Sequence, residues 1–213
     1  MAAKCYSVIT ADVVDSRKIE SFRVRRDRKL DEVSRLHLKE KLILSPYTIT
    51  AWDEFQVILS KPENTPRVIF DMRRLFFPFQ LWIAVGMGTA SGVHKNPINI
   101  HAGGEAFERA RQAADQLKSR NSKHRILTRF ESGKEIFDTI ANTIYRLQDS
   151  LLQGTTVKQW AAANMQAETG RQEITAKRLK LDVSTVSRNL KRGYYWHLVE
   201  TVDAMEHIVK AYF

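Results

Sequence analysis

The stretch YSVITADVV, residues 6–14, carries the strongest strand signal of the chain. Its run of β-branched and apolar residues is typical of a buried strand. Asp12 interrupts this run near its end, and a carboxylate that is buried without a partner is costly. We therefore expect a central strand whose end places Asp12 beside a cation, a cluster of N–H groups or water.

Helix and strand signals alternate on the C-terminal side of this strand. Trp52-Asp53-Glu54 separates two short apolar runs, which predicts a hairpin with acids at its tip, and Pro46 is expected to end the helix before it. The resulting order predicts an α+β fold with a ferredoxin-like palm, an antiparallel sheet and helices on one face. The predicted helices of this part are 22–42, 64–77 and 105–117, and the strands are 47–51, 55–59, 79–87 and 126–128.

Strand signals stop after residue 130, and the rest of the chain is predicted to be helical. The expected helices are 131–152, 155–168, 172–181, 184–192 and 195–213. The last of them has one apolar face, which we expect to pair with a second copy of the chain. That face consists of Leu198, Val202, Met205, Ile208 and Val209.

Residues 172–192, QEITAKRLKLDVSTVSRNLKR, form the most specific pattern in the chain. Their apolar spacing predicts a short amphipathic helix, a tight turn at Asp182, and a second helix capped by the Ser184 hydroxyl. Val186 and Leu190 are four residues apart and are expected to face the core of this hairpin. Small hydroxyls near the start of the second helix, with cations behind them, suit a helix that lies in a DNA groove.

The same stretch resembles a bacterial helix-turn-helix of the type EIAxxLgvSxsTVSRxLkr. ITAKRLKL matches the first helix and VSTVSRNLKR the recognition helix, while Lys180-Leu181-Asp182 replaces the usual glycine turn. The alternative is an ordinary helical hairpin with a solvated basic face or a role in protein contacts. The residues expected to contact DNA are Ser184, Thr185, Ser187, Arg188, Lys191 and Arg192. Two half-sites on an operator would match a homodimer.

Charge supports a polyanionic partner for this C-terminal part. The 213-residue chain has a formal net charge of +10, and residues 171–192 hold seven Lys and Arg against two acidic residues. The basic cluster from Arg17 to Lys41 is interrupted by acids, which is typical of a solvated face. The single Cys5 excludes a disulfide framework and a Cys-rich zinc site. Without a long apolar window or a signal-peptide layout, we expect a cytoplasmic protein with no membrane partner.

Two N-terminal acids form a second candidate site. If the strand 6–14 lies next to the hairpin, Asp12 and Asp53 meet at one edge of the sheet. Two carboxylates there can hold Mg²⁺, which keeps waters and takes substrate phosphates. In the alternative, Asp12 caps a loop through local N–H groups, and Asp53 and Glu54 are solvated turn residues. Spacing alone leaves both interpretations open.

Resemblance adds to this argument. VITADVVDSR resembles the first strand of class III nucleotidyl cyclases, roughly FADIVGST, and WDEF resembles their hairpin. VGMGTASGV and GGEAFERARQAADQL are similar to the strand, loop and helix that follow in those enzymes. The whole combination, with the C-terminal helix-turn-helix, resembles the SatD family of bacterial proteins over essentially the full chain. The resemblance implies a cyclase-like palm domain in residues 1–130.

When the roles of the cyclase residues are carried over by position, the resemblance implies that Asp12 and Asp53 are metal ligands. It also implies that Arg111 is the catalytic arginine that stabilises phosphate charge in the transition state. Two positions depart from the cyclase pattern: Phe107 stands where the ribose-orienting Asn is expected, and Trp52 replaces the hairpin Gly. The backbone implied to bind phosphates is that of Val13, Val14, Asp15 and Ser16.

These observations lead to one main hypothesis and two rivals. The main hypothesis is a DNA-binding transcriptional regulator with a palm domain, a helical linker at 131–155 and a helix-turn-helix domain at 156–213. The palm would act as a sensor or dimerisation unit that binds nucleotide and Mg²⁺. The first rival is a Mg²⁺-dependent nucleotidyl cyclase or nucleotidyltransferase-like enzyme that makes a nucleotide signal. The second is a protein–protein adaptor that binds neither DNA nor nucleotide.

Overall fold

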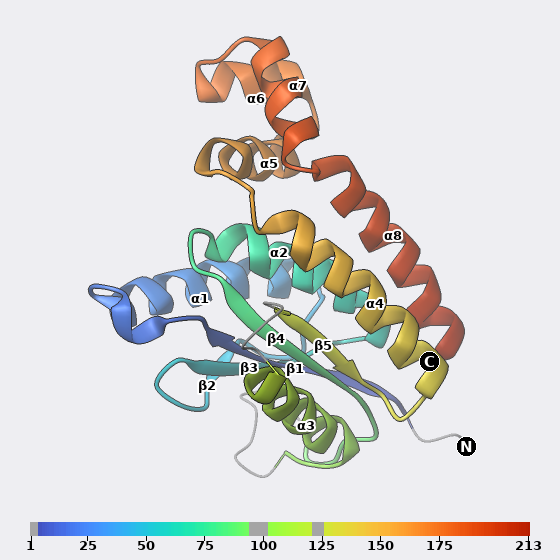
Figure 1. The fold of residues 1–213 in the computed structure, drawn as a ribbon. Helices are drawn as coiled ribbons and strands as arrows, with labels where there is room; N and C mark the ends of the chain where they lie inside the picture. The colour runs from blue at the N-terminus through green and yellow to red at the C-terminus, as the bar shows by residue number, and fades with distance from the viewer. Residues whose placement is uncertain (1–3, 94–101, 121–125) are drawn as a thin grey trace.

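The computed structural model describes residues 4–93, 102–120 and 126–213 (Figure 1). Over these residues the chain forms a five-stranded sheet and eight α-helices, which confirms the α+β class. The strands are β1 (Tyr6–Val13), β2 (Thr48–Ile49), β3 (Glu54–Ile58), β4 (Leu81–Gly88) and β5 (Thr128–Glu131). The helices are α1 (Phe22–Lys39), α2 (Thr65–Phe76), α3 (Glu105–Arg120), α4 (Glu135–Leu152), α5 (Val157–Thr169), α6 (Gln172–Leu179), α7 (Val183–Arg192) and α8 (Tyr195–Tyr212).

The sheet is mixed, so the expected antiparallel sheet is wrong at one pair of strands. Its order is β2-β3-β1-β4-β5, with β1 in the centre and antiparallel to both β3 and β4. β4 and β5 are parallel, with Ile83 paired to Thr128. The physical reason is the connection between them, because α3 carries the chain back across the sheet before β5 begins.

Helices cover both faces of the sheet, which corrects the expectation of a single covered face. Figure 1 shows α3 on one side and α1, α2 and α4 on the other. Alternate residues of β1 account for the two layers, since Val8 packs towards α3 while Ile9 belongs to the larger core on the opposite face. Gly86 of β4 allows close approach of α3, because a Cβ there would overlap the backbone of Ala106 and Ala110.

α1 ends at Lys39, well before Pro46, so the proline is not what terminates the helix. The N–H of Glu40 still donates to the Leu36 carbonyl, and Lys41 then adopts a left-handed conformation with a φ of 58°. A residue in that conformation ends a helix.

The C-terminal helices divide between two cores. α5, α6 and α7 pack together around Trp160, Val186 and Leu190. α4, which occupies most of the expected linker 131–155, contributes Phe137 and Tyr145 to the core under the sheet. α8 runs from the α5–α7 cluster back along α4 (Figure 1).

The apolar face of α8 is covered within its own chain, so the expectation that it pairs with a second copy is wrong. Leu198 and Val202 pack in the α5–α7 cluster, while Met205 and Val209 pack in the main core. Among the residues that the structure describes, no helix combines the length and apolarity needed to cross a membrane.

Candidate functional site

α6 and α7 form a helical hairpin at the tip of the molecule. Lys180 is left-handed with a φ of 54°, and the Leu181 N–H donates to the Ala176 carbonyl at 3.0 Å, so the turn between the helices is tight. Asp182 precedes the first residue of α7, which corrects the predicted cap at Ser184: that serine lies within the first turn of the helix. Val186 is fully buried, as the spacing predicts.

One face of α7 carries the hydroxyl and cationic side chains expected to contact DNA. Ser184, Ser187, Arg188, Lys191 and Arg192 are exposed, and Thr185 is half-buried. The Arg188 guanidinium donates to the Thr185 hydroxyl at 3.1 Å, which holds both side chains at the same surface.

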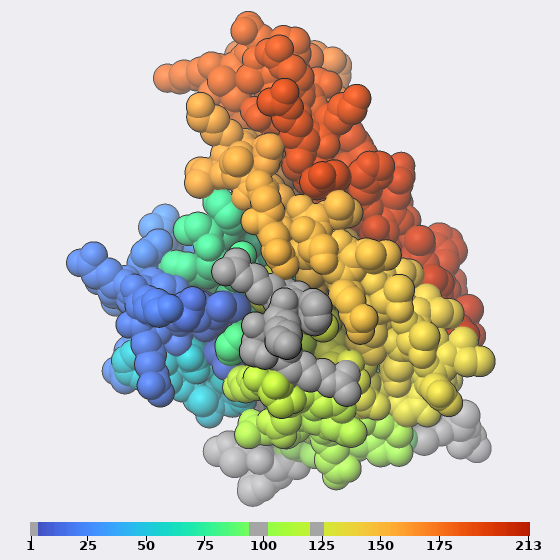
Figure 2. Space-filling view, viewed as in Figure 1, coloured from blue at the N-terminus to red at the C-terminus, as the bar shows by residue number. Residues whose placement is uncertain are grey.

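Cations of this hairpin are largely free of acidic partners. Within the described ranges, no ion pair involves Lys177, Lys180, Arg188, Lys191 or Arg192. In contrast, Arg171 lies 3.8 Å from Glu173 and Arg178 lies 3.9 Å from Glu168. Figure 2 shows that the hairpin stands out from the body of the molecule, so a long polyanion can approach it. The arrangement therefore offers an exposed, uncompensated positive surface.

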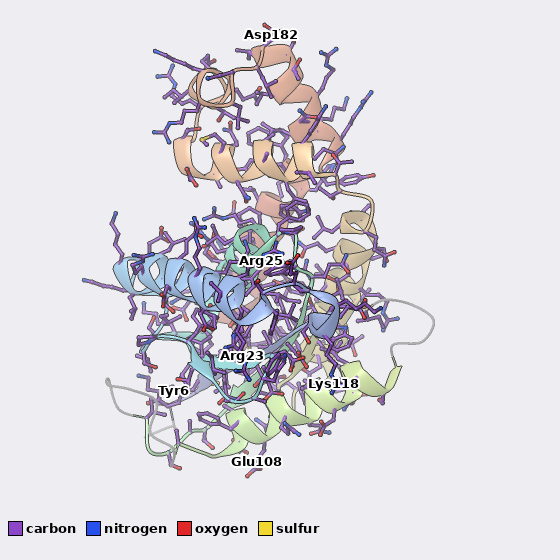
Figure 3. The ribbon with its side chains drawn as sticks, turned by 90° about the vertical axis from the view of Figure 1, so that its left-hand side faces the viewer. Tyr6, Arg23, Arg25, Glu108, Lys118 and Asp182 are labelled. Carbon is purple, nitrogen blue, oxygen red and sulfur yellow. The ribbon has the colours of Figure 1, made fainter. Side chains whose placement is uncertain are left out.

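The N-terminal acids lie far from this hairpin. Figure 3 shows Asp182 at one end of the molecule and Lys118 on α3 towards the other. The register of β1 and β3 places Glu54, rather than Asp53, directly across from Asp12. Lys118 Nζ lies 2.8 Å from Asp12 Oδ2 and 3.7 Å from Glu54 Oε2. The buried strand-end acid therefore has a cation from α3 as its partner.

Arg111 lies on the same helix as Lys118 but mostly in solvent. Its Nη1 is 3.7 Å from Glu54 Oε2, and its Nε is 3.5 Å from Asp115 Oδ1. Burial raises the pKa of Asp12, an effect that the ion pair with Lys118 opposes and the nearby acids increase. The structure thus brings Arg111 and the Asp12 region together through Glu54.

Asp53 and the residues after β1 form a separate contact. Asp53 Oδ2 accepts a 2.5 Å hydrogen bond from the Ser16 hydroxyl. In the predicted phosphate cradle, the Val14 N–H donates to the Gln80 carbonyl at 2.9 Å, and Asp15 is exposed with a φ of 55°. Val13 is a buried strand residue. The N–H of Val14 is therefore already used within the fold.

The positions that depart from the cyclase pattern have structural contacts. Trp52 is about half exposed; its ring stacks on Phe22 at 6.3 Å and carries the Arg23 guanidinium at 4.0 Å from its centroid. Phe107 packs against the small core between the sheet and α3. Both aromatic side chains are therefore held by contacts within the fold.

The sequence comparison identifies the family. The sequence model of the SatD family matches residues 6–196. The chain belongs to the SatD family. This confirms the resemblance to the SatD family. No curated protein matches the chain.

Solved structures resemble this SatD-family chain only distantly. A regulator of polyketide synthase expression from Bifidobacterium adolescentis is 12% identical, with 96% of this chain and 82% of that chain covered and a TM-score of 0.32. An apo Csm1–Csm4 cassette is 14% identical, with 98% and 37% covered and a TM-score of 0.35. Neither likeness carries a functional argument.

The acid cluster of the SatD-family chain consists of Asp12, Glu54 and Lys118, and its fit to Mg²⁺ depends on the acceptors that remain free. Asp12 Oδ1 is buried and has no hydrogen-bond partner, so it has a free acceptor for a cation. Over the described residues, however, no group of three or more His, Cys, Asp or Glu side chains could hold a metal. The available donors therefore fit only one type of Mg²⁺ site. In such a site one or two carboxylates bind the ion, and water and phosphate oxygens complete its coordination shell.

Sequence reasoning missed two members of this cluster. Glu54 faces Asp12 only because of the β1–β3 register, which a single sequence does not specify. Lys118 lies one residue beyond the helix predicted at 105–117. It follows Arg111 by seven residues, two helical turns, so a longer predicted helix would have placed both cations on one face.

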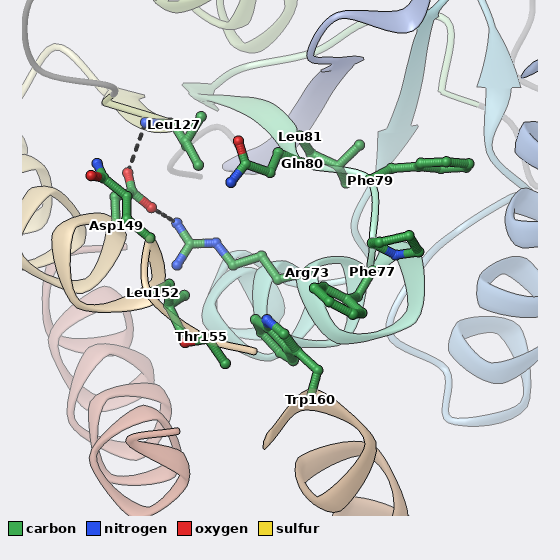
Figure 4. Close-up of a pocket in the computed structure, with 12 residues that line it drawn as sticks. Arg73, Phe77, Phe79, Gln80, Leu81, Leu127, Asp149, Leu152, Thr155 and Trp160 are labelled. Carbon is green, nitrogen blue, oxygen red and sulfur yellow. Dashed lines mark hydrogen bonds and ion pairs between the residues drawn. The ribbon is translucent and has the colours of Figure 1, made fainter. Parts of the chain in front are cut away.

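A cavity lies between the sheet and the C-terminal helices of the SatD-family chain. Figure 4 shows Phe77, Phe79 and Trp160 around it, with the ion pair of Arg73 and Asp149 at one side. No local sequence pattern indicates this cavity, because its lining comes from segments far apart in the chain.

Proposed function

We propose that this SatD-family protein is a DNA-binding transcriptional regulator that contacts duplex DNA through α7. The observation that carries the proposal is the exposed face of this helix, where Arg188, Lys191 and Arg192 have no acidic partner among the described residues. Phosphates are neutralised by such cations, and hydroxyls such as those of Ser184 and Ser187 hydrogen-bond to phosphates and base edges.

The remaining fold is assigned a sensory or dimerising role in this proposal. Residues 1–130 would form a cyclase-like palm, which is supported by the strand order and by Asp12 at the end of the central strand β1. Residues 156–213 would form the helix-turn-helix domain, and the protein would act in the cytoplasm as a homodimer on two half-sites. Because the apolar face of α8 is covered, the second copy would bind through another surface.

Fluorescence anisotropy with a labelled random-sequence DNA duplex tests the proposal. The wild-type affinity should fall steeply between about 50 and 200 mM salt, because counterions are released on binding. The double variant Arg188→Ala/Lys191→Ala removes two phosphate contacts and should reduce the slope of log K against log salt by roughly two units.

The matched control carries the same change in charge elsewhere. Lys39→Ala/Lys210→Ala removes two exposed cations from α1 and the C-terminal end of α8, away from the proposed DNA face. It should leave the slope close to the wild-type value. Equal slopes for the two double variants would show that α7 is not the DNA-binding surface.

A second candidate function is a Mg²⁺-dependent enzyme that makes a nucleotide signal. The unpartnered Oδ1 of buried Asp12 favours it, since this atom is the free acceptor of the acid cluster. Incubation with Mg²⁺ and the common ribonucleoside triphosphates should then give a product that Asp12→Asn abolishes. The absence of any product from the wild-type protein would reject this candidate.

A further inference from the structure

The cavity of Figure 4 lies between the edge of the sheet and Trp160 of α5, a helix that packs with α7. Its volume is about 90 Å³, and it is partly open to solvent. It is bounded by the end of α2 and the segment after it, by Leu127, by the end of α4, and by Trp160 of α5. The centroids of the Phe77 and Trp160 rings are 5.5 Å apart and their planes are inclined by 27°, so one wall consists of two stacked aromatic rings.

Charges in the lining cancel. Arg73 is the only cation of the wall and Asp149 the only anion within the described residues, and they are paired with each other. Asp149 Oδ2 also accepts the backbone N–H groups of Leu127 and Thr128, each at 2.9 Å. A charged ligand would therefore have to give up its hydration without gaining a counter-ion, which is costly.

One polar group of the wall is left without a partner. The side chain of Arg73 is 9% exposed, and its terminal nitrogens already donate to Gln148, Thr128 and Asp149. The Thr155 hydroxyl oxygen, in contrast, is buried and has no hydrogen-bond partner. Unmade hydrogen bonds of this kind are expensive inside a protein, so a ligand or water that satisfies them is stabilised.

We propose that this cavity binds a small, neutral, planar ligand that carries a carbonyl group. The aromatic walls fit a flat unsaturated body. The Thr155 hydroxyl supplies a donor for the carbonyl oxygen. The volume is below the ~150 Å³ of a cavity known to enclose benzene, so a single ring fits only with part of it at the open side.

The position of the cavity links it to the proposed function. Trp160 belongs both to the cavity wall and to the core that supports α7. A ligand that contacts Trp160 on one side and the segment Phe77–Leu81 on the other would fix how α5 sits on the sheet. This regulatory role rests on the proposed DNA binding, whereas ligand binding itself does not. By linkage, any change that the ligand makes in DNA affinity is matched by an equal effect of DNA on ligand affinity.

Benzamide is the probe for the site, since it is neutral, flat and carries one carbonyl group. Ligand-observed NMR titration of the full chain should show saturable binding with a Kd on the order of 1 mM, typical of so small a ligand. Benzoate, which is charged, should bind at least about tenfold more weakly. Absence of saturable benzamide binding, or equal binding of benzoate, would overturn the proposal.

Variants at Thr155 test whether benzamide binds in this cavity. Thr155→Val removes only the hydroxyl and should weaken benzamide about two- to tenfold, the effect of one hydrogen bond. Thr155→Phe fills the cavity and should abolish binding. Thr143→Val, at an exposed position of α4 outside the lining, should bind as the wild type does. Thermal melts of the unliganded variants verify folding, and unchanged benzamide affinity in both folded Thr155 variants would refute the site.

A separate titration tests the link to DNA. Saturating benzamide should change the affinity for the random-sequence duplex in the wild type and leave it unchanged in Thr155→Phe. If the protein binds benzamide but no DNA, the ligand site stands and the proposed function fails. If the protein binds benzamide and DNA but benzamide does not change the DNA affinity, the proposed regulatory role is wrong.

Discussion

Asp149 offers the most quantitative test of how the two parts of the fold are joined. It lies on α4, is 1% exposed, and accepts the N–H groups of Leu127 and Thr128 at the start of β5. It also pairs with Arg73 of α2, whose side chain is 9% exposed. Asp149→Ala therefore breaks contacts among a strand and two helices in one step.

The expected cost follows from what the substitution leaves behind. Two backbone N–H groups lose their acceptor, at about 1–3 kcal/mol each. The Arg73 guanidinium also becomes an unpaired buried charge, and removing one partner of a buried pair costs about 3–5 kcal/mol. These effects overlap and water relieves part of them, so we expect a loss of about 5 kcal/mol, which is a large share of the ~5–15 kcal/mol stability of a typical domain.

Urea denaturation followed by circular dichroism measures this free energy of unfolding. The double variant Arg73→Met/Asp149→Leu should be more stable than Asp149→Ala, because no charge is left buried alone. Asp203→Ala, at an exposed position of α8, is the control and should stay within about 0.5 kcal/mol of wild type. A cost below about 1 kcal/mol for Asp149→Ala would refute the reasoning.

Three further predictions concern the body of the fold. Burial opposes ionisation of Asp71, but the His37 ring, whose Nε2 lies 3.4 Å from Asp71 Oδ2, and the charges of Arg74 and Arg67 outweigh this and lower its pKa from 3.8 to about 2. Because the folded pKa is the lower one, about 2 kcal/mol of stability present above pH 4 should be lost as the pH falls from 4 to 2, and acid titration of Asp71→Asn should show a flatter profile. Gly86→Ala would force its Cβ against the backbone of Ala106 and should cost at least about 3 kcal/mol in urea denaturation, whereas a loss below about 1 kcal/mol would contradict the close packing of α3. Lys118→Met removes the cation beside Asp12, so NMR titration should show a higher pKa for that carboxyl than in wild type, and an unchanged pKa would contradict the pairing.

Local patterns predicted most of the elements. The β-branched run at residues 6–14 became the central strand β1, and the apolar spacing in 172–192 became α6 and α7. Such signals depend only on neighbouring residues, so one sequence contains them. The direction of β5 was missed because a strand signal of three residues, 126–128, carries no information on the path of α3 before it.

Features that depend on tertiary packing were not predictable in the same way. The apolar face of α8 looked available for a second copy, but α2 and α4 of the same chain cover it. Glu54 and Lys118 join Asp12 only after the strands have paired and α3 has packed on them. A single sequence shows that such side chains need partners without showing which partners the fold supplies.

Lysine reactivity in the presence of DNA tests the central claim most directly. The full chain is acetylated with and without the random-sequence duplex, and the modification of each lysine is measured by mass spectrometry. Lys177, Lys180 and Lys191 should be protected by DNA, while the exposed Lys39 and Lys210 should react as in its absence. Protection of Lys39 or Lys210 with full reactivity at Lys191, or no protection at any lysine, would contradict DNA binding through α7.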